Sequence, residues 1–250
     1  MIKKRKIALW AVAFWLIVWE IASISIGQEI LLVSPVDVLI KIKELAFEGE
    51  FWNAIGFTIV RIIGGFLLAV VLGVVLAVVS VRYKYIRELL EPFIRTVKAI
   101  PVASFIILVL IWISSANLSI VISFLMVFPI IYTNIYEGIV QTDPKMIQMA
   151  NVFKMDLKQQ VRYIYCSQVL PYLQSACSIS LGMCWKAGIA AEVIGMPNNS
   201  IGENLYNAKV FFDTPALFAW TVVIICISII SEKLFMKLIS MYIEKLERAL

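Results

Sequence analysis

The sequence predicts an all-α, polytopic membrane protein with about six transmembrane helices and one polar, helical loop. Of its 250 residues, 62% are hydrophobic, and the mean hydropathy is +0.92. Soluble domains have roughly 45–50% apolar residues. Several apolar runs approach the roughly 20 residues that an α-helix needs to cross the hydrocarbon core. Residues 142–172, by contrast, are polar and basic between very apolar segments. We therefore expect a membrane domain that offers this one segment to a partner protein.

The predicted spans are residues 7–26, 55–81, 90–113, 117–137, 169–193 and 215–237. No Gly/Ser-rich or Pro-rich linker separates them, so we expect a single transmembrane domain over residues 1–250. Residues 55–238 would form its core, and residues 1–54 the first span and a helix along the outer surface. The first span is longer than the roughly 7–15 apolar residues of a signal peptide, so we expect it to remain uncleaved. Ser34 and Pro35 are suitable residues to begin the surface helix.

The distribution of basic residues predicts the orientation, because Lys and Arg concentrate in cytoplasmic loops. The N-terminus has four basic residues and no acid, whereas residues 27–53 carry five acidic residues against two lysines. Basic residues also follow the second and fourth spans: Arg82, Lys84, Arg87, Arg95 and Lys98, then Lys145, Lys154, Lys158 and Arg162. We expect both termini and these two segments to be cytoplasmic, and residues 27–53 to lie outside.

Small residues recur at helical spacing in the second and fifth spans. Gly65, Ala69, Gly73 and Ala77 form one stripe, which predicts close packing against a neighbouring helix. The fifth span differs because its stripes include two charged residues, Lys186 and Glu192. A charge at the bilayer centre costs at least roughly 2.5–3.5 kcal/mol, so such residues usually face a bundle interior or a wet cavity.

Lys186 and Glu192 cannot pair on one face of a helix, because six residues correspond to an offset of about 120°. Each needs a partner on another helix, a water-filled path or the membrane surface. Glu192 lies near the predicted outer end of the span, where its side chain could also reach the interface. A place in a translocation pathway and a structural pairing are both open for these two residues.

The composition gives no indication of an active site. The chain has no histidine and no C-x-x-C pair among its four cysteines, and it lacks the G-x-x-x-x-G-K-[ST] phosphate loop. We therefore expect no catalytic residues, no metal and no cofactor in this chain, and no nucleic acid as a partner. If ATP supplies the energy, another polypeptide must bind it.

The polar segment predicts an amphipathic helix. Asp143 can cap a helix that begins at Pro144. One apolar face then contains Met146, Met149, Ala150, Phe153 and Leu157, and the opposite face is basic. Such a helix could lie on anionic lipid or insert into a groove of a partner protein. Helical geometry alone does not separate these two alternatives.

The same segment resembles the coupling loop of bacterial ABC importer permeases, in particular those that move nitrate, sulfonates and taurine. Gln148-Met149-Ala150 stands where that family has Glu-Ala-Ala, and Leu170-Pro171-Tyr172 stands at its closing motif. Family-like positions continue in order over residues 34–238, at Thr58–Arg61, Gly64–Phe66, Val97–Pro101 and Trp185–Gly195. The chain departs from the pattern at Gln148, at Lys154 in place of the central glycine, and at Cys166-Ser167 in place of the first Leu-Pro.

The resemblance implies a permease subunit of an ATP-driven importer in the bacterial cell membrane, without enzymatic activity of its own. Two copies would enclose the substrate pathway, lined by Lys186 and Glu192. Separate ATPase subunits would bind the coupling loop, and an extracytoplasmic binding protein would deliver a small anion or related solute. The implied ATPase-contacting residues are Gln148, Met149, Ala150, Asn151, Phe153 and Lys154.

An ion-coupled secondary transporter, which works without an ATPase, is the main alternative. Such transporters often contain internal repeats and helices broken near the bilayer midplane. No convincing repeat is present here, although Pro101 and Pro129 could interrupt helices. A membrane enzyme would need clustered catalytic side chains, which the sequence lacks. The identity of the substrate does not follow from the sequence.

Overall fold

A computed structural model describes the backbone of residues 9–248 and the side chains of residues 9–241. The basic cluster at residues 3–6 and the side chains of the C-terminal tail, both used to predict the orientation, therefore lie outside the described residues. Within them, the helical elements are α1 (Leu9–Ile26), α2 (Pro35–Ala46), α3 (Gly49–Arg82), α4 (Lys84–Ala99), α5 (Val102–Leu110), α6 (Ser115–Val140), α7 (Pro144–Val152), α8 (Leu157–Gln160), the π-helix η1 (Val161–Tyr165), α9 (Cys166–Gly195), α10 (Ile201–Val210) and α11 (Thr214–Arg248).

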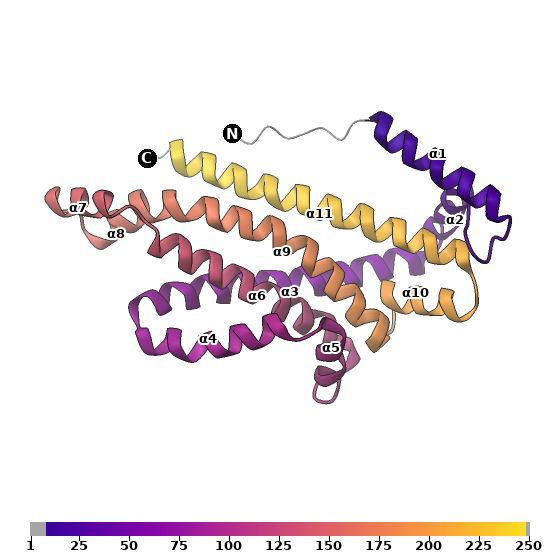
Figure 1. The fold of residues 1–250 in the computed structure, drawn as a ribbon, viewed down its shortest axis with the longest axis horizontal. Coiled ribbons are helices and arrows are strands. Elements are labelled where there is room, and N and C mark those ends of the chain that lie inside the picture. Colours follow the sequence, from indigo (N-terminus) through magenta and orange to yellow (C-terminus); the bar gives the residue numbers. More distant parts are fainter. Residues whose placement is uncertain (1–8, 249–250) are drawn as a thin grey trace.

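The long helices α3, α6, α9 and α11 form an elongated bundle (Figure 1). Helix α6 packs extensively against both α3 and α9, and α11 packs against α9. The short helices α7 and α8 project from one end of the bundle, which also contains the C-terminal end of α11, while α2 and α10 lie at the other end (Figure 1). The expected all-α membrane architecture is confirmed.

The small-residue stripe of the second predicted span forms a close helix contact in the bundle core, between α3 and α6. A Cβ atom added to Gly73 would lie 2.9 Å from the Cγ2 atom of Ile131. One added to Gly65 would overlap the backbone carbonyl of Ile120. The packing role predicted for this stripe is confirmed, because only a residue without a side chain fits at these two positions.

Among residues 9–248, five helices are long and apolar enough to span a membrane, and there is a sixth span if α4 and α5 are counted together. The continuous third span predicted at 90–113 is wrong, since these two helices meet at an angle of 110°. The break lies at Ile100-Pro101, where Ile100 is extended with ψ of 131°. Proline disfavours the helical conformation in the residue before it, which explains the position of the break.

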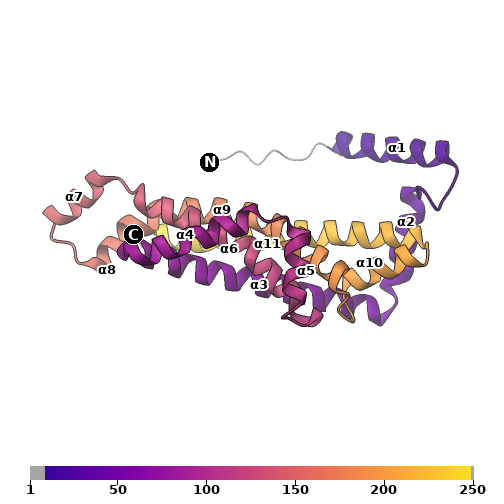
Figure 2. The ribbon, with the colours of Figure 1, turned by 60° about the horizontal axis from the view of Figure 1, so that its bottom comes forward.

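Helix α1 lies apart from the bundle in both ribbon views (Figures 1 and 2), and it contains no buried residue. Its contact with the rest of the described chain centres on Trp19. The Trp19 indole N–H donates to the Val33 carbonyl at 2.9 Å, and its ring lies 5.8 Å from that of Phe218. The first span is thus a helix separate from the bundle, which contacts the rest of the described chain through the C-terminal half of α1.

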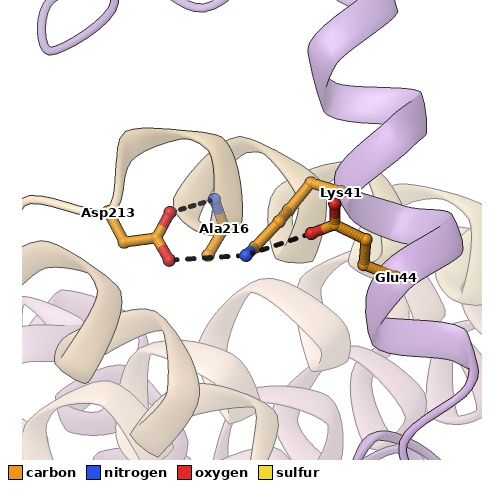
Figure 3. A network of polar contacts seen from close by, with 4 residues as sticks. All are labelled: Lys41, Glu44, Asp213 and Ala216. Atoms are coloured by element: carbon orange, nitrogen blue, oxygen red, sulfur yellow. Dashed lines mark hydrogen bonds and ion pairs between the residues drawn. The ribbon is translucent and has the colours of Figure 1, made fainter.

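The predicted surface helix is present as α2, and Ser34 caps it by accepting a hydrogen bond from the Asp37 amide at 3.2 Å. A polar network joins α2 to the start of α11 (Figure 3). Lys41 lies 3.4 Å from the Glu44 carboxylate and 3.8 Å from that of Asp213. The Asp213 carboxylate also accepts from the Ala216 amide at 3.0 Å, so one side chain both caps α11 and holds α2.

Candidate functional site

The predicted polar loop forms a helix–turn–helix that projects from the bundle as α7 and α8 (Figure 1). Asp143 caps α7 by accepting from the Lys145 amide at 2.9 Å, and Pro144 is the first helical residue, as predicted. Asp156 caps α8 through a capping box with Gln159, in which each side chain accepts from the backbone amide of the other residue. Both helices therefore begin at caps that the local sequence provides.

The turn between α7 and α8 keeps a glycine-like geometry although the residue is lysine. Lys154 has φ of 51°, in the left-handed region. The Met155 amide donates to the Ala150 carbonyl at 2.9 Å, and the Lys154 amide donates to the Asn151 carbonyl at 3.1 Å. This pair of bonds defines a Schellman motif, the usual end of a helix before a sharp turn. The two backbone bonds hold Lys154 in the left-handed conformation, so a sharp turn forms here without a glycine.

The apolar residues of this loop are exposed. Val152, Phe153 and Leu157 have 78%, 72% and 79% of their surface exposed, and Met146 and Met149 are nearly half exposed. Gln148, Asn151 and Lys154 are also exposed. Ala150 is the exception, since it is fully buried on the inner side of the turn. Five predicted partner-binding residues are thus accessible, and the sixth supports the turn.

Three contacts fix the base of the loop where α6 ends and α9 begins. The Tyr172 hydroxyl donates to the Gln141 side chain at 2.8 Å, and the Asp143 amide donates to the Gln168 side chain at 3.0 Å. The Tyr172 ring also packs on Gly138, where an added Cβ would lie 2.9 Å from the ring. The sequence indicated Tyr172 only through a resemblance, and nothing in the local pattern pointed to its partners.

Glu192 is fully buried near the opposite end of α9. Its carboxylate accepts from the Thr58 hydroxyl of α3 at 2.8 Å and from the Gly202 amide at 3.3 Å. Thr58 in turn accepts from the Ile201 amide at 3.1 Å. The side chain thus points into the bundle rather than toward the membrane surface, and it connects α9, α3 and the start of α10.

Other polar groups lie buried along the same helices. The Arg61 guanidinium is 7% exposed, with its Cζ atom 3.2 Å from the centre of the Phe57 ring. Among the residues with described side chains, one Arg61 nitrogen and one Glu192 oxygen have no hydrogen-bond partner, and neither do the hydroxyls of Ser119 and Ser123 on α6. Buried polar groups are normally satisfied, so this part of the bundle has capacity for further polar contacts.

Lys186 lies on a different face of α9 from Glu192, as the helical offset requires, and its side chain is exposed. Its neighbours on this face include Ile179 and Met183, which are 57% and 45% exposed, and Gly182, which has open space around it. We call the surface of Ile179, Gly182, Met183 and Lys186 the open face of α9. The structure therefore separates the two predicted pathway residues, one on this face and one in the core.

The family model for the binding-protein-dependent transport system inner membrane component matches residues 69–244. The chain belongs to this family of permeases. The resemblance noted in the sequence is confirmed, and the membership favours an ABC importer permease over an ion-coupled secondary transporter. Such a permease is a multi-pass transport component rather than an enzyme.

Individual permeases support the assignment. The chain is 22% identical to the taurine transport system permease protein of Escherichia coli, over 86% of this chain and 80% of the relative. It is 27% identical to the nitrate import permease protein of Synechococcus elongatus, over 78% and 73%. It is 25% identical to a Bacillus subtilis protein described as an aliphatic sulfonates transport permease, over 93% and 82%. The fold is similar to that in the crystal structure of an amino acid ABC transporter with histidines, with a TM-score of 0.54 and 20% identity over 85% of this chain and 97% of that chain.

Proposed function

We propose that this permease forms the substrate pathway of an ATP-driven importer as a dimer, and that its α7–α8 loop binds a separate ATPase subunit. The main support is the loop itself. It presents Val152, Phe153 and Leu157 to the outside on a structure stabilised by two caps and a Schellman turn. Apolar residues on a preformed helical loop match the helix-in-groove mode of protein recognition. In this assignment Gln148, Met149, Asn151, Phe153 and Lys154 contact the ATPase, and Ala150 maintains the turn.

The open face of α9 supports the dimer. If its charged side chain faced lipid near the bilayer centre, Lys186 would raise the free energy of membrane insertion by at least roughly 2.5–3.5 kcal/mol. A second copy of the chain that covers this face would instead place two Lys186 side chains along a wet pathway between the subunits. Glu192 supports the wall of that pathway from within the bundle.

The substrate is proposed as a small anion or a related small solute, of the nitrate, sulfonate or taurine type. The relatives named above transport such molecules by their descriptions, and a cationic Lys186 in the pathway fits an anion. An extracytoplasmic binding protein delivers the substrate, and the ATP is bound by the partner ATPase. Both termini and the α7–α8 loop lie on the cytoplasmic side in this proposal.

Co-purification of the permease with its native ATPase subunit tests the coupling site. We expect Phe153→Asp to abolish stoichiometric recovery of the ATPase while the permease still inserts and folds. Phe47→Asp is the matched control, because Phe47 is 83% exposed and lies next to α2, at the opposite end of the bundle. Equal recovery of the ATPase with both variants would contradict the assignment.

A further inference from the structure

An apolar pocket of about 210 Å³ lies between α3, α6 and α9 at the end of the bundle where α7 projects. Its walls include Val74 and Val78 from α3, Ile139 from α6, and Val169 and Leu170 from α9. All five side chains are aliphatic. Tyr165 and Cys166 complete the lining at the rim, and a pocket with mainly aliphatic walls among membrane-spanning helices suits a hydrocarbon chain.

Two cations lie at the rim of this pocket. A shallow hollow next to it shares Val161 and Cys166 with the pocket and adds Lys158 from α8 and Arg162 from η1. The two lining sets thus form one continuous surface, apolar inside the bundle and cationic at its edge. We call this surface the rim groove.

The geometry of η1 widens the helix at this rim. The Cys166 amide donates to the Val161 carbonyl, five residues earlier, in place of the usual bond to the fourth. Such π-turns are rare, and they occur frequently at functional sites. Here the wide turn contains Val161, Tyr165 and Arg162, which all line the rim groove.

The two basic side chains at the rim form no ion pair with any carboxylate among the described side chains. Among the residues with described side chains, no carboxylate lies within 4.0 Å of Lys158 or Arg162. The nearby Asp156 carboxylate accepts a hydrogen bond from the Gln159 amide at 2.7 Å. Arg162 has one further contact, with its Cζ atom 5.7 Å from the centre of the Tyr163 ring.

We propose that the rim groove binds an anionic phospholipid, with an acyl chain in the aliphatic pocket and the headgroup phosphate at Lys158 and Arg162. Clusters of basic residues at a membrane surface attract anionic lipids, and the apolar lining of the pocket matches an acyl chain in polarity. The site goes beyond the proposed transport function. Because α8 and η1 connect the ATPase-binding loop to α9, the lipid would stabilise the base of that loop.

Native mass spectrometry of the purified permease tests this proposal with dioleoyl phosphatidylglycerol, and with dioleoyl phosphatidylcholine for comparison. We expect preferential retention of phosphatidylglycerol. The double variant Lys158→Gln/Arg162→Gln should weaken this retention about 10- to 30-fold. Arg82→Gln/Lys84→Gln is the matched control, since it removes the same charge near the same end of the bundle but outside the groove.

A second variant tests the acyl chain. Val78→Trp places a large ring in the aliphatic pocket and leaves both cations intact, so it should also reduce retention of phosphatidylglycerol. Binding of glycerol 1-phosphate, which lacks the chains, should be too weak to detect in every variant. Equal retention of the two lipids, equal loss in the Arg82/Lys84 control, or tight binding of glycerol 1-phosphate would each overturn the proposal.

Discussion

Lys154 adopts the left-handed backbone conformation that glycine adopts most easily. Its left-handed backbone is held by the bonds of Met155 and Lys154 to the end of α7. For a residue with a Cβ atom this conformation costs about 1–2 kcal/mol. The permease therefore carries a small conformational cost between α7 and α8, and the long, charged side chain of Lys154 is exposed there.

Replacement of Lys154 measures this cost. Lys154→Gly should leave the thermal midpoint unchanged or slightly higher, because glycine adopts positive φ without strain, and any fall in ATPase recovery then measures the loss of the lysine side chain from the contact. Lys154→Val should lower recovery, since a branched side chain is most disfavoured in this region. Thermal unfolding in detergent and co-purification provide the two measurements. Better recovery with valine than with glycine would contradict the importance of the turn.

Glu192 is the residue on which the packing of α10 depends. Glu192→Ala should destabilise the permease by about 2–4 kcal/mol, because Thr58 and the Gly202 amide lose their buried acceptor and Arg61 loses a nearby negative charge. Glu192→Gln keeps an oxygen that can accept from Thr58 and should cost less. Thermal unfolding of both variants gives the comparison. Glu50→Ala is the control, because Glu50 is exposed. If Glu192→Ala and Glu192→Gln lowered the stability equally, the hydrogen bonds to Thr58 and Gly202 would not explain the role of Glu192.

At the scale of elements, α3 contains two adjacent glycines of which only Gly65 contacts α6. Gly65 meets the α6 backbone, whereas a Cβ at Gly64 would find nothing within 4 Å. Gly64→Ala should therefore be neutral or stabilising by up to about 1 kcal/mol, through helix propensity alone. Gly65→Ala should destabilise by about 1–3 kcal/mol, because the two helices must separate. Similar melting temperatures for the two variants would show that the helices tolerate a wider spacing.

Elements that depend on neighbouring residues could be predicted from the sequence, and those that depend on distant partners could not. Asp143-Pro144 and Ser34-Pro35 correctly marked the starts of α7 and α2, because capping acts within one turn. Pro101 was noted as a possible interruption, but residues 90–113 were still predicted as one span, because the size of a bend between α4 and α5 depends on distant packing. The contact of Glu192 with Thr58 joins residues 134 positions apart, so no local pattern could reveal it.

At the scale of the whole molecule, the open face of α9 predicts where two permeases meet. In a background without native cysteines, Ile179→Cys should form a disulfide-linked dimer on mild oxidation, because the position is exposed near Lys186 on this face. Leu181→Cys lies on the same helix but is fully buried, so it should remain monomeric on a denaturing gel. Cross-linking at 181, or none at 179 in an assembled importer, would place the dimer contact elsewhere.

The hydrogen bond between Glu192 and Thr58 also limits how the subunit can move. Helix α9 is continuous from the base of the α7–α8 loop to Glu192. There it is hydrogen-bonded to α3, which packs against α6 through the glycine contact. A rotation of α9 about its own axis would break these connections, so a push from the loop must displace three helices together. We therefore expect α3, α6 and α9 to move together, so that a displacement at the α7–α8 end of the bundle is transmitted to the Glu192 end.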